Sequence, residues 1–90
     1  MQFEWNDKKS RSNMIKHGID FTTAKALWED PNRIEIHTGH PIENRTIIIG
    51  KIGKKLWASI FTMRGNTIRI ISVRRARKKE TKLYDQKENS

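Results

Sequence analysis

From Arg33 onward, apolar and polar residues alternate along the chain in short, isoleucine-rich runs. Alternation with a period of two is the pattern of a β-strand that buries one face. Short glycine-containing segments separate the runs, and glycine suits the positive φ angles of hairpin turns. The sequence therefore predicts a four-stranded antiparallel meander, with strands near 34–36 and over 46–52, 56–62 and 67–73.

Helical patterns flank this meander on both sides. Asn6 offers an N-cap oxygen for a polar helix that reaches His17, and Gly18 suits the left-handed residue after it. Asp20 caps a second helix, which we expect over 21–29 because its apolar residues recur every 3.6 positions. The predicted fold class is α+β, with a short N-terminal strand within 1–5, two helices, the meander and a C-terminal helix from 76. We expect one domain over 1–86 and a frayed end at 87–90.

The net charge of +9 is concentrated in the second half of the chain. Residues 1–45 hold seven basic and seven acidic side chains, whereas residues 46–90 hold 12 basic and three acidic ones. The segment 69–82 alone carries seven cations against the single acidic residue Glu80. Such a cluster attracts polyanions, so it indicates a nucleic acid or an acidic protein partner. A solvated helix face is the alternative interpretation.

Several functional classes are disfavoured by the sequence. The longest apolar run, 47–49, is far shorter than a membrane span, and the absence of cysteine fits a cytoplasmic protein. Neither a phosphate-binding loop nor a nucleophile elbow occurs, so we expect no cofactor. His37, His40 and Glu43 lie three residues apart across a turn, which is a weak metal-site pattern, and we expect no metal.

The first predicted helix carries a polar stripe. Lys9, Asn13, Lys16 and His17 occur at i, i+4, i+7 and i+8, so they share one helix face. This stripe is suited to hold a phosphate backbone, with His17 available for proton transfer near neutral pH. An exposed polar face without a ligand is an equal alternative.

A second candidate site is the arginine-rich stretch 68–76. Strict alternation places Arg69 and Arg75 on one strand face and Arg74 on the other. The arginines therefore cannot share a face unless a bulge or the strand end redirects one of them. Glu43 and Arg45, two residues apart, share a face and can pair with each other or with this stretch. Structural salt bridges are the alternative for all of these residues.

Taken in order along the chain, these segments resemble the BrnT toxin family. The opening similarity lies in Phe3-Glu4-Trp5, Lys9, Asn13, Lys16-His17-Gly18, Phe21 and Ala24. It continues through Glu43-x-Arg45 and Arg69-Ile70-Ile71-Ser72-x-Arg74-x-Ala76 to Glu80 and Tyr84. The similarity spans about residues 2–85, and its most specific piece is the segment that starts at Arg69.

The resemblance implies a toxin of a type II toxin–antitoxin pair, with a fold like that of the RelE-type ribonucleases. Such toxins cleave RNA without a metal and stop translation. The implied protein partner is a BrnA-type antitoxin, a DNA-binding protein that neutralises the toxin and represses the operon with it. Contact of the toxin with DNA is then only indirect, through the complex.

Metal-free RNA cleavage needs a base, an acid and cations around the reacting phosphate. Arginine supplies the cations well, so we expect Arg69 and Arg74 in that role, with Arg45 as a third. The motif-matched candidates for proton transfer are His17, Glu43, Glu80 and Tyr84. The expected contacts to the RNA backbone are Lys9, Lys16, Arg75, Lys78 and Lys79.

Two other functions fit the same residues. The basic half of the chain accounts for nucleic-acid binding without catalysis, so a non-enzymatic binding module is one alternative. A pure interaction protein, whose basic surface docks an acidic partner chain, is the other. RNA that is bound but left intact would favour the first alternative over a ribonuclease.

Overall fold

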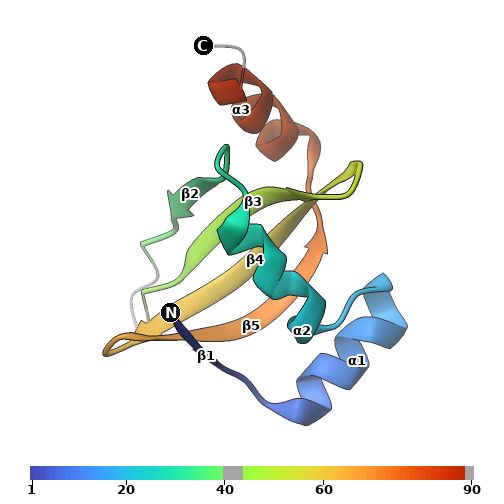
Figure 1. The fold of residues 1–90 in the computed structure, drawn as a ribbon, viewed down its shortest axis with the longest axis vertical. Helices are drawn as coiled ribbons and strands as arrows, with labels where there is room; N and C mark the ends of the chain where they lie inside the picture. The colour runs from blue at the N-terminus through green and yellow to red at the C-terminus, as the bar shows by residue number, and fades with distance from the viewer. Residues whose placement is uncertain (40–43, 89–90) are drawn as a thin grey trace.

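The computed structural model describes residues 1–39 and 44–88 and confirms the α+β class. Its element order begins with a strand and ends with a helix (Figure 1). The helical elements are α1 (Asp7–His17), α2 (Phe21–Ala24), the 3-10 helix η1 (Lys25–Glu29) and α3 (Lys78–Glu88). The strands are β1 (Gln2–Glu4), β2 (Ile34–His37), β3 (Thr46–Ile52), β4 (Lys55–Arg64) and β5 (Thr67–Arg75).

All described strands form one mixed sheet in the order β1-β5-β4-β3-β2. The antiparallel meander β2-β3-β4-β5 is confirmed, with all three adjacent pairs antiparallel. The sheet is larger than predicted, because β1 joins it as a fifth strand, parallel to β5, with Glu4 opposite Arg69. The first residues of the chain thus lie beside a strand more than 60 residues away in sequence.

The predicted caps of α1 are confirmed, but the second predicted helix is divided. Asn6 accepts a hydrogen bond from the amide of Lys9, and Gly18 has the left-handed φ of 75° after the helix. The segment 21–29 is α-helical only to Ala24 and continues as the tighter η1. The backbone of η1 approaches β3 closely at Gly50, where an added Cβ would lie 3.3 Å from the carbonyl oxygen of Leu27.

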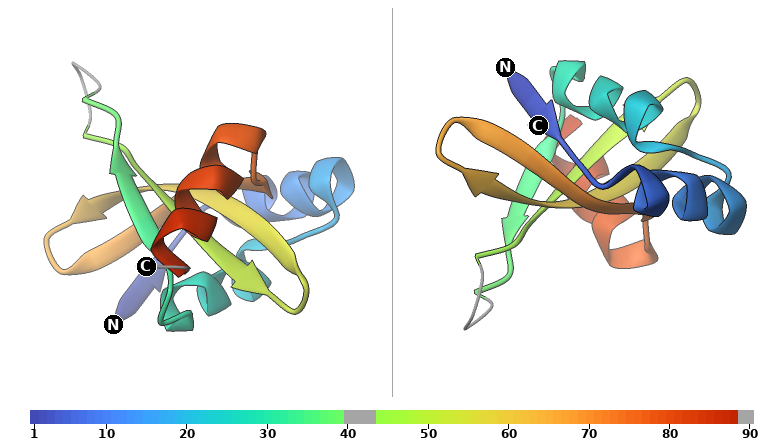
Figure 2. Two further views of the ribbon diagram at one scale, coloured as in Figure 1. Left: turned by 90° about the horizontal axis from the view of Figure 1, so that it is seen from above. Right: turned by 90° about the horizontal axis from the view of Figure 1, so that it is seen from below.

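Helices lie on both faces of the sheet. In Figure 2, seen from below, α1 and α2 lie in front of the sheet and α3 lies behind it. The larger core fills the α2 side, where Phe21, Leu27 and Trp28 pack on inward side chains of the strands, such as Ile48 and Phe61. Trp28 makes edge-to-face ring contacts with Phe3 of β1 and with Phe61 of β4, which fastens the added strand to the core.

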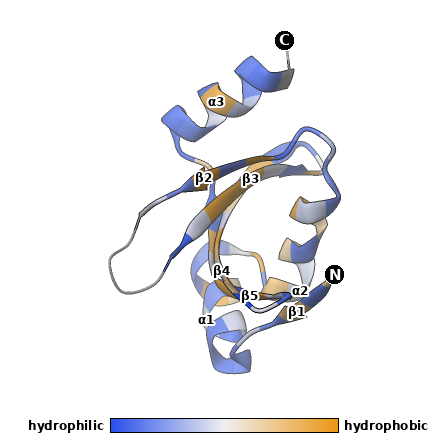
Figure 3. Cartoon of the chain, turned by 90° about the vertical axis from the view of Figure 1, so that its left-hand side faces the viewer, coloured by the Kyte–Doolittle hydropathy of each residue, from blue (hydrophilic) through white to orange (hydrophobic). Residues whose placement is uncertain are grey.

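The second core lies under α3 and covers only part of the opposite face. Tyr84 is 1% exposed and packs with Ile49 and Ala58, and α3 contacts β2 and β3 (Figure 3). Leu83, the neighbouring apolar residue of α3, is 45% exposed. The helix continues to Glu88, past the predicted domain end at 86. None of the helices in the described part of the chain is long and apolar enough to cross a membrane.

Asn13 is a structural residue rather than part of a phosphate-binding stripe. Its side chain is buried, and its amide nitrogen donates to the carbonyl oxygens of Ile19 and Val73 at 2.9 and 2.8 Å. Its oxygen accepts the amide of Val73 at 3.1 Å. The side chain thus continues the hydrogen bonding along the outer edge of β5, where β1 has ended. Of the predicted stripe, Lys9, Lys16 and His17 are exposed, whereas Asn13 is buried.

Substitution Asn13→Ala is expected to lower the free energy of unfolding by about 2–4 kcal/mol, because two buried backbone groups of Val73 lose their partners. Urea unfolding followed by circular dichroism measures this change. The neighbouring exposed residue provides the control, since Ser12→Ala is expected to change stability by less than about 0.5 kcal/mol. Equal stability of the two variants would show that Asn13 does not support the edge of β5.

Candidate active site

A β-bulge decides which arginines of β5 share a face. In the pairing with β4, Ile60 lies opposite Ser72 but Phe61 lies opposite Ile70, so Ile71 is an extra residue on β5. The extra residue reverses the alternation beyond it. Arg69 and Arg74 consequently lie on the same face of the sheet, the face that α3 partly covers. The strict alternation expected from the sequence is corrected by this bulge.

The polar side chains on the uncovered half of this face form a row across the sheet. Thr62 of β4 lies opposite Arg69, and Arg69 lies opposite Glu4 of β1. Arg45 directly precedes β3, where alternation places it on the same face as Ile47. We name these four residues, Arg45, Thr62, Arg69 and Glu4, the cross-strand row. The cross-strand row contains two of the predicted phosphate-binding arginines, Arg45 and Arg69, on one side of the sheet.

Arg69 forms an ion pair with Glu4 at the edge of this row. Its Nη1 donates to Glu4 Oε2 at 2.8 Å. The two side chains are 28% and 37% exposed, so the pair is open to solvent and to a ligand. A partly exposed pair of this kind contributes only about 0–1 kcal/mol to stability.

Arg74 lies on the same face but forms a separate, more buried group with Glu80. Its two terminal nitrogens donate to the two carboxylate oxygens at 2.8 and 3.0 Å. Glu80 Oε1 also accepts the amide of Arg77 at 2.7 Å, which satisfies a free donor at the start of α3. The hydrogen bond from Arg74 lowers the pKa of Glu80, against the effect of burial and with help from the Arg77 amide. Glu80 is therefore held as a carboxylate by its structural partners.

The two arginines are also separated along the sheet. Their partners Thr62 and Ala58 are four residues apart in β4, which corresponds to about 13 Å between the backbones of Arg69 and Arg74. Each guanidinium is engaged by a different carboxylate. The structure therefore brings them to one face without joining them around one phosphate.

Tyr84 and Asp30 connect α3 to the chain after η1. The hydroxyl of Tyr84 donates to Asp30 Oδ2 at 2.7 Å, and the amide of Lys51 donates to the same oxygen. Burial raises the pKa of Asp30, but the hydrogen bonds from Tyr84 and from the amides of Asn32 and Lys51 outweigh it and lower the pKa overall. Tyr84 is thus buried and committed to this contact, at the wall of a pocket of about 350 Å³ that Asp30 and Lys51 also line.

These two carboxyl groups predict how stability depends on pH. Because the pKa values of Glu80 and Asp30 are lowered by folding, their stabilisation is complete above the ordinary carboxyl pKa of about 4. It is lost as the pH falls through the lower pKa values of the folded protein. We expect the free energy of unfolding, measured with urea, to fall from about pH 5 downward, and to fall less steeply in Glu80→Gln. Equal slopes in both proteins would contradict the assignment.

The remaining predicted residues that the structure describes do not gather around Arg69. Lys9, Lys16 and His17 are exposed on α1, across the sheet from the cross-strand row. Arg75 also points to the other face, where its guanidinium lies 5.4 Å from the centre of the Trp57 ring. Lys78 and Lys79 are exposed on the first turn of α3, and Glu43 and His40 lie outside the described residues.

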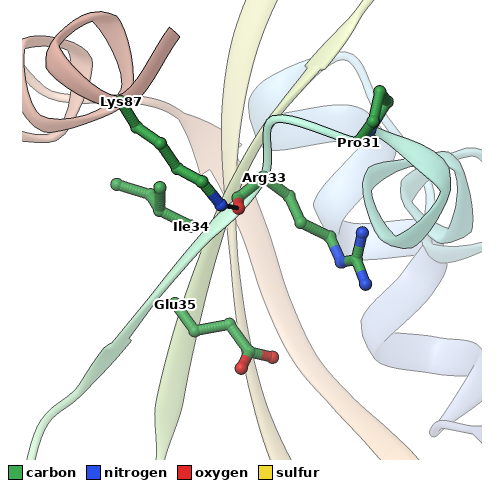
Figure 4. Close-up of a pocket in the computed structure, with 5 residues that line it drawn as sticks. All are labelled: Pro31, Arg33, Ile34, Glu35 and Lys87. Atoms are coloured by element: carbon green, nitrogen blue, oxygen red, sulfur yellow. Dashed lines mark hydrogen bonds between the residues drawn. The ribbon is translucent and has the colours of Figure 1, made fainter. Parts of the chain in front are cut away.

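A cavity of about 610 Å³ lies elsewhere, at the β2 edge. Figure 4 shows its lining residues, including Arg33, Glu35 and Lys87. Lys87 donates to the carbonyl oxygen of Arg33, whose own Nη1 donates to the carbonyl of Asp30. The side chains of Lys87 and Arg33 thus bind backbone carbonyl oxygens and serve as structural contacts. Within 1–39 and 44–88, no three histidine or acidic side chains are grouped to hold a metal ion.

The sequence was compared with known families and proteins. It matches the family described as "Ribonuclease toxin, BrnT, of type II toxin-antitoxin system" over residues 5–80, more than four fifths of the chain. The chain belongs to the BrnT family. The matched range contains Asn13, Arg45, Arg69, Arg74 and Glu80, while Glu4 and Tyr84 lie outside it. Comparison with individual curated proteins gave no match.

Membership of the BrnT family indicates the reaction, the substrate class and the kind of protein partner. The family consists of ribonuclease toxins, so RNA is the substrate class and phosphodiester cleavage the reaction. A type II system also implies an antitoxin partner. In this BrnT-family chain, the cross-strand row places arginines from two separate segments, Arg45 and Arg69, on the same face of the sheet.

Sequence reasoning missed two residues that organise the site, Glu4 and Asp30. Glu4 pairs with an arginine 65 positions away, and Asp30 receives a hydroxyl 54 positions away. Spacing between neighbouring residues in the sequence cannot predict contacts between residues so far apart. The one available signal was an arginine in an isoleucine-rich strand, which requires a partner, but that signal does not say which carboxylate provides it.

Proposed function

We propose that this BrnT-family chain is a metal-independent endoribonuclease that binds RNA on the uncovered half of the sheet, with Arg69 at the reacting phosphate. The observation that carries the proposal is the bulge at Ile71, which turns Arg69 to the side of Arg45 and away from the α1–α2 side. Guanidinium groups match phosphate oxygens and stabilise the charge that develops in the transition state without a metal.

The surrounding charge supports RNA binding on this side. Twelve basic and three acidic residues follow residue 45, and Lys78 and Lys79 are exposed next to the arginine strand. Such a surface attracts the phosphate backbone regardless of base sequence. Arg74 has a supporting role in this proposal, because it fixes α3 through Glu80.

The cellular consequence belongs to the same proposal. RNA cleavage inhibits translation in the cytoplasm, and a BrnA-type antitoxin neutralises the toxin by covering the basic face with acidic residues. DNA is contacted only by the antitoxin in the complex. A fold relationship to the RelE-type ribonucleases also remains a prediction.

The direct test is incubation of the purified protein with RNA in excess EDTA. Attack by a 2′-oxygen predicts fragments that end in a 2′,3′-cyclic phosphate and a 5′-hydroxyl, and no cleavage of DNA of the same sequence. Cleavage that appears only after Mg²⁺ is added would contradict metal independence. Addition of the protein to a translation extract tests the inhibition of protein synthesis.

The structural hydrogen bonds of Glu80 and Tyr84 favour a second candidate function, nucleic-acid binding without catalysis. Glu80 and Tyr84, the predicted acid and base on α3, are both hydrogen-bonded to other groups of the protein as structural partners. A non-catalytic, basic nucleic-acid-binding module needs neither group. The same incubation separates the candidates, because RNA retained by the protein but left intact in EDTA and in extract would favour the binding module.

A further inference from the structure

The carboxylate of Glu4 is the group in the cross-strand row with acid–base chemistry. One of its oxygens accepts a hydrogen bond from Arg69 Nη1 at 2.8 Å. The other oxygen has no hydrogen bond to any of the described residues, and the side chain remains 37% exposed. A carboxylate held on one side and open on the other is suited to accept a proton.

The geometry of arginine brings this carboxylate next to a bound phosphate. A guanidinium has five N–H donors in one plane, and Glu4 uses one nitrogen, Nη1. Among the described residues, Nε and Nη2 of Arg69 have no other partner, so they remain able to bind a phosphoryl oxygen. The phosphate and Glu4 would then bind adjacent edges of the same Arg69 guanidinium group. A ribose 2′-hydroxyl, which neighbours its own 3′-phosphate, lies within reach of Glu4 in this arrangement.

Two other described carboxylates on the α3 side, those of Glu80 and Asp30, are committed to structural contacts. Both oxygens of Glu80 bind Arg74, and one also accepts a backbone amide. Both oxygens of Asp30 accept hydrogen bonds, including the hydroxyl of Tyr84. In the part of the chain that the structure describes, Glu4 therefore combines an arginine partner, an open oxygen and access to solvent on this face.

We infer that Glu4 is the general base of the RNA cleavage, an inference that rests on the proposed function. The 2′-hydroxyl gives its proton to the open oxygen of Glu4, and the electron pair left on O2′ forms the bond to phosphorus. The bond from phosphorus to O5′ breaks with its electron pair on O5′, which takes a proton from water. The hydroxide so formed removes the proton from Glu4, so the products are the cyclic phosphate and the 5′-hydroxyl.

The test compares the wild type with Glu4→Gln in single-turnover cleavage, at saturating protein and in EDTA. Loss of a general base lowers a rate by about 10²–10⁴-fold, so we expect cleavage at least about 100-fold slower. Binding of a 2′-O-methyl RNA, which has no free nucleophile, is expected to stay within about threefold or become tighter, because a negative charge is removed. Glu35→Gln is the matched control, since Glu35 is an exposed carboxylate on the edge strand β2.

Formate adds a readout that a structural role would not affect. It is expected to restore cleavage by Glu4→Ala, where it can occupy the place of the lost carboxylate beside Arg69, and not by Arg69→Ala. Full activity of Glu4→Gln, or a parallel loss of RNA binding and cleavage, would overturn the inference while the wild type still cleaves RNA. A wild type that cleaves no RNA under any of these conditions would overturn the proposed function as well.

Discussion

Arg69→Ala is expected to slow RNA cleavage by about 10²–10³-fold, the effect of removing one donor that stabilises developing charge. Its stability is expected to change little, because the pair with Glu4 is partly exposed at both partners. The effect on the cleavage rate and the effect on stability can therefore be measured separately. Single-turnover cleavage in EDTA measures the first, and urea unfolding measures the second.

Matched variants sharpen this prediction. Arg69→Lys keeps the charge but cannot bind Glu4 and a phosphate with separate nitrogens of one planar fork, so we expect an intermediate rate. Arg11→Ala removes a cation from the exposed surface of α1 and is expected to cleave at the wild-type rate. A folded Arg69→Ala protein with full activity, or one that remains toxic to growing cells, would remove Arg69 from the mechanism.

Arg74→Ala is expected to have the opposite profile, with a large loss of stability. Removal of one partner from a buried ion pair costs about 3–5 kcal/mol, because the other charge is left buried without compensation. The side chains of Arg74 and Glu80 are only 18% and 10% exposed, and Glu80 would keep only the amide of Arg77. We expect a loss of about 3 kcal/mol, at the lower end of that range, in urea unfolding.

Arg77→Ala serves as the control for Arg74. Arg77 contacts Glu80 through its backbone amide, which the substitution preserves, and its own side chain is exposed. Its stability is expected to stay within about 0.5 kcal/mol of the wild type. Similar losses for Arg74→Ala and Arg77→Ala would mean that the ion pair does not anchor α3.

The parts of the fold that depend on local pattern can be predicted from the sequence. Strand β3 covers the range 46–52 that its isoleucine-rich run predicts, and α1 begins at the Asn6 cap and ends before Gly18. In each case the signal and the structure lie within the same few residues. Period, cap and turn residue act at short range, so their consequences are readable before any tertiary contact is known.

The parts that depend on distant contacts cannot be read in the same way. The parallel pairing of β1 with β5 joins the start of the chain to residues 67–69. The bulge at Ile71 depends on how β5 aligns with β4, and nothing in the run Ile70-Ile71-Ser72 marks one residue as extra. The sequence shows that a bulge would be needed to bring arginines together, but only the register shows that it joins Arg69 with Arg74.

The candidate site was predictable in its residue types and less so in their roles. The arginines stood out because cations are costly within an isoleucine-rich strand unless they have a partner or a ligand. Glu80 and Tyr84 fit a catalytic pair by their i, i+4 spacing, but their partners Arg74 and Asp30 make them anchors of α3. Spacing places two residues on one helix face, and only the packing of that face decides what they contact.

The central claim is that RNA binds the uncovered sheet face that carries Arg69. The most direct measurement is an NMR titration of ¹⁵N-labelled protein with a short 2′-O-methyl RNA, which binds without being cleaved. The largest amide shifts are predicted at the cross-strand row, at Glu4, Thr62 and Arg69, and through the bulge to Ser72. Shifts concentrated instead on α1, around Lys9, Lys16 and His17, would place the RNA on the other side of the sheet and contradict the account.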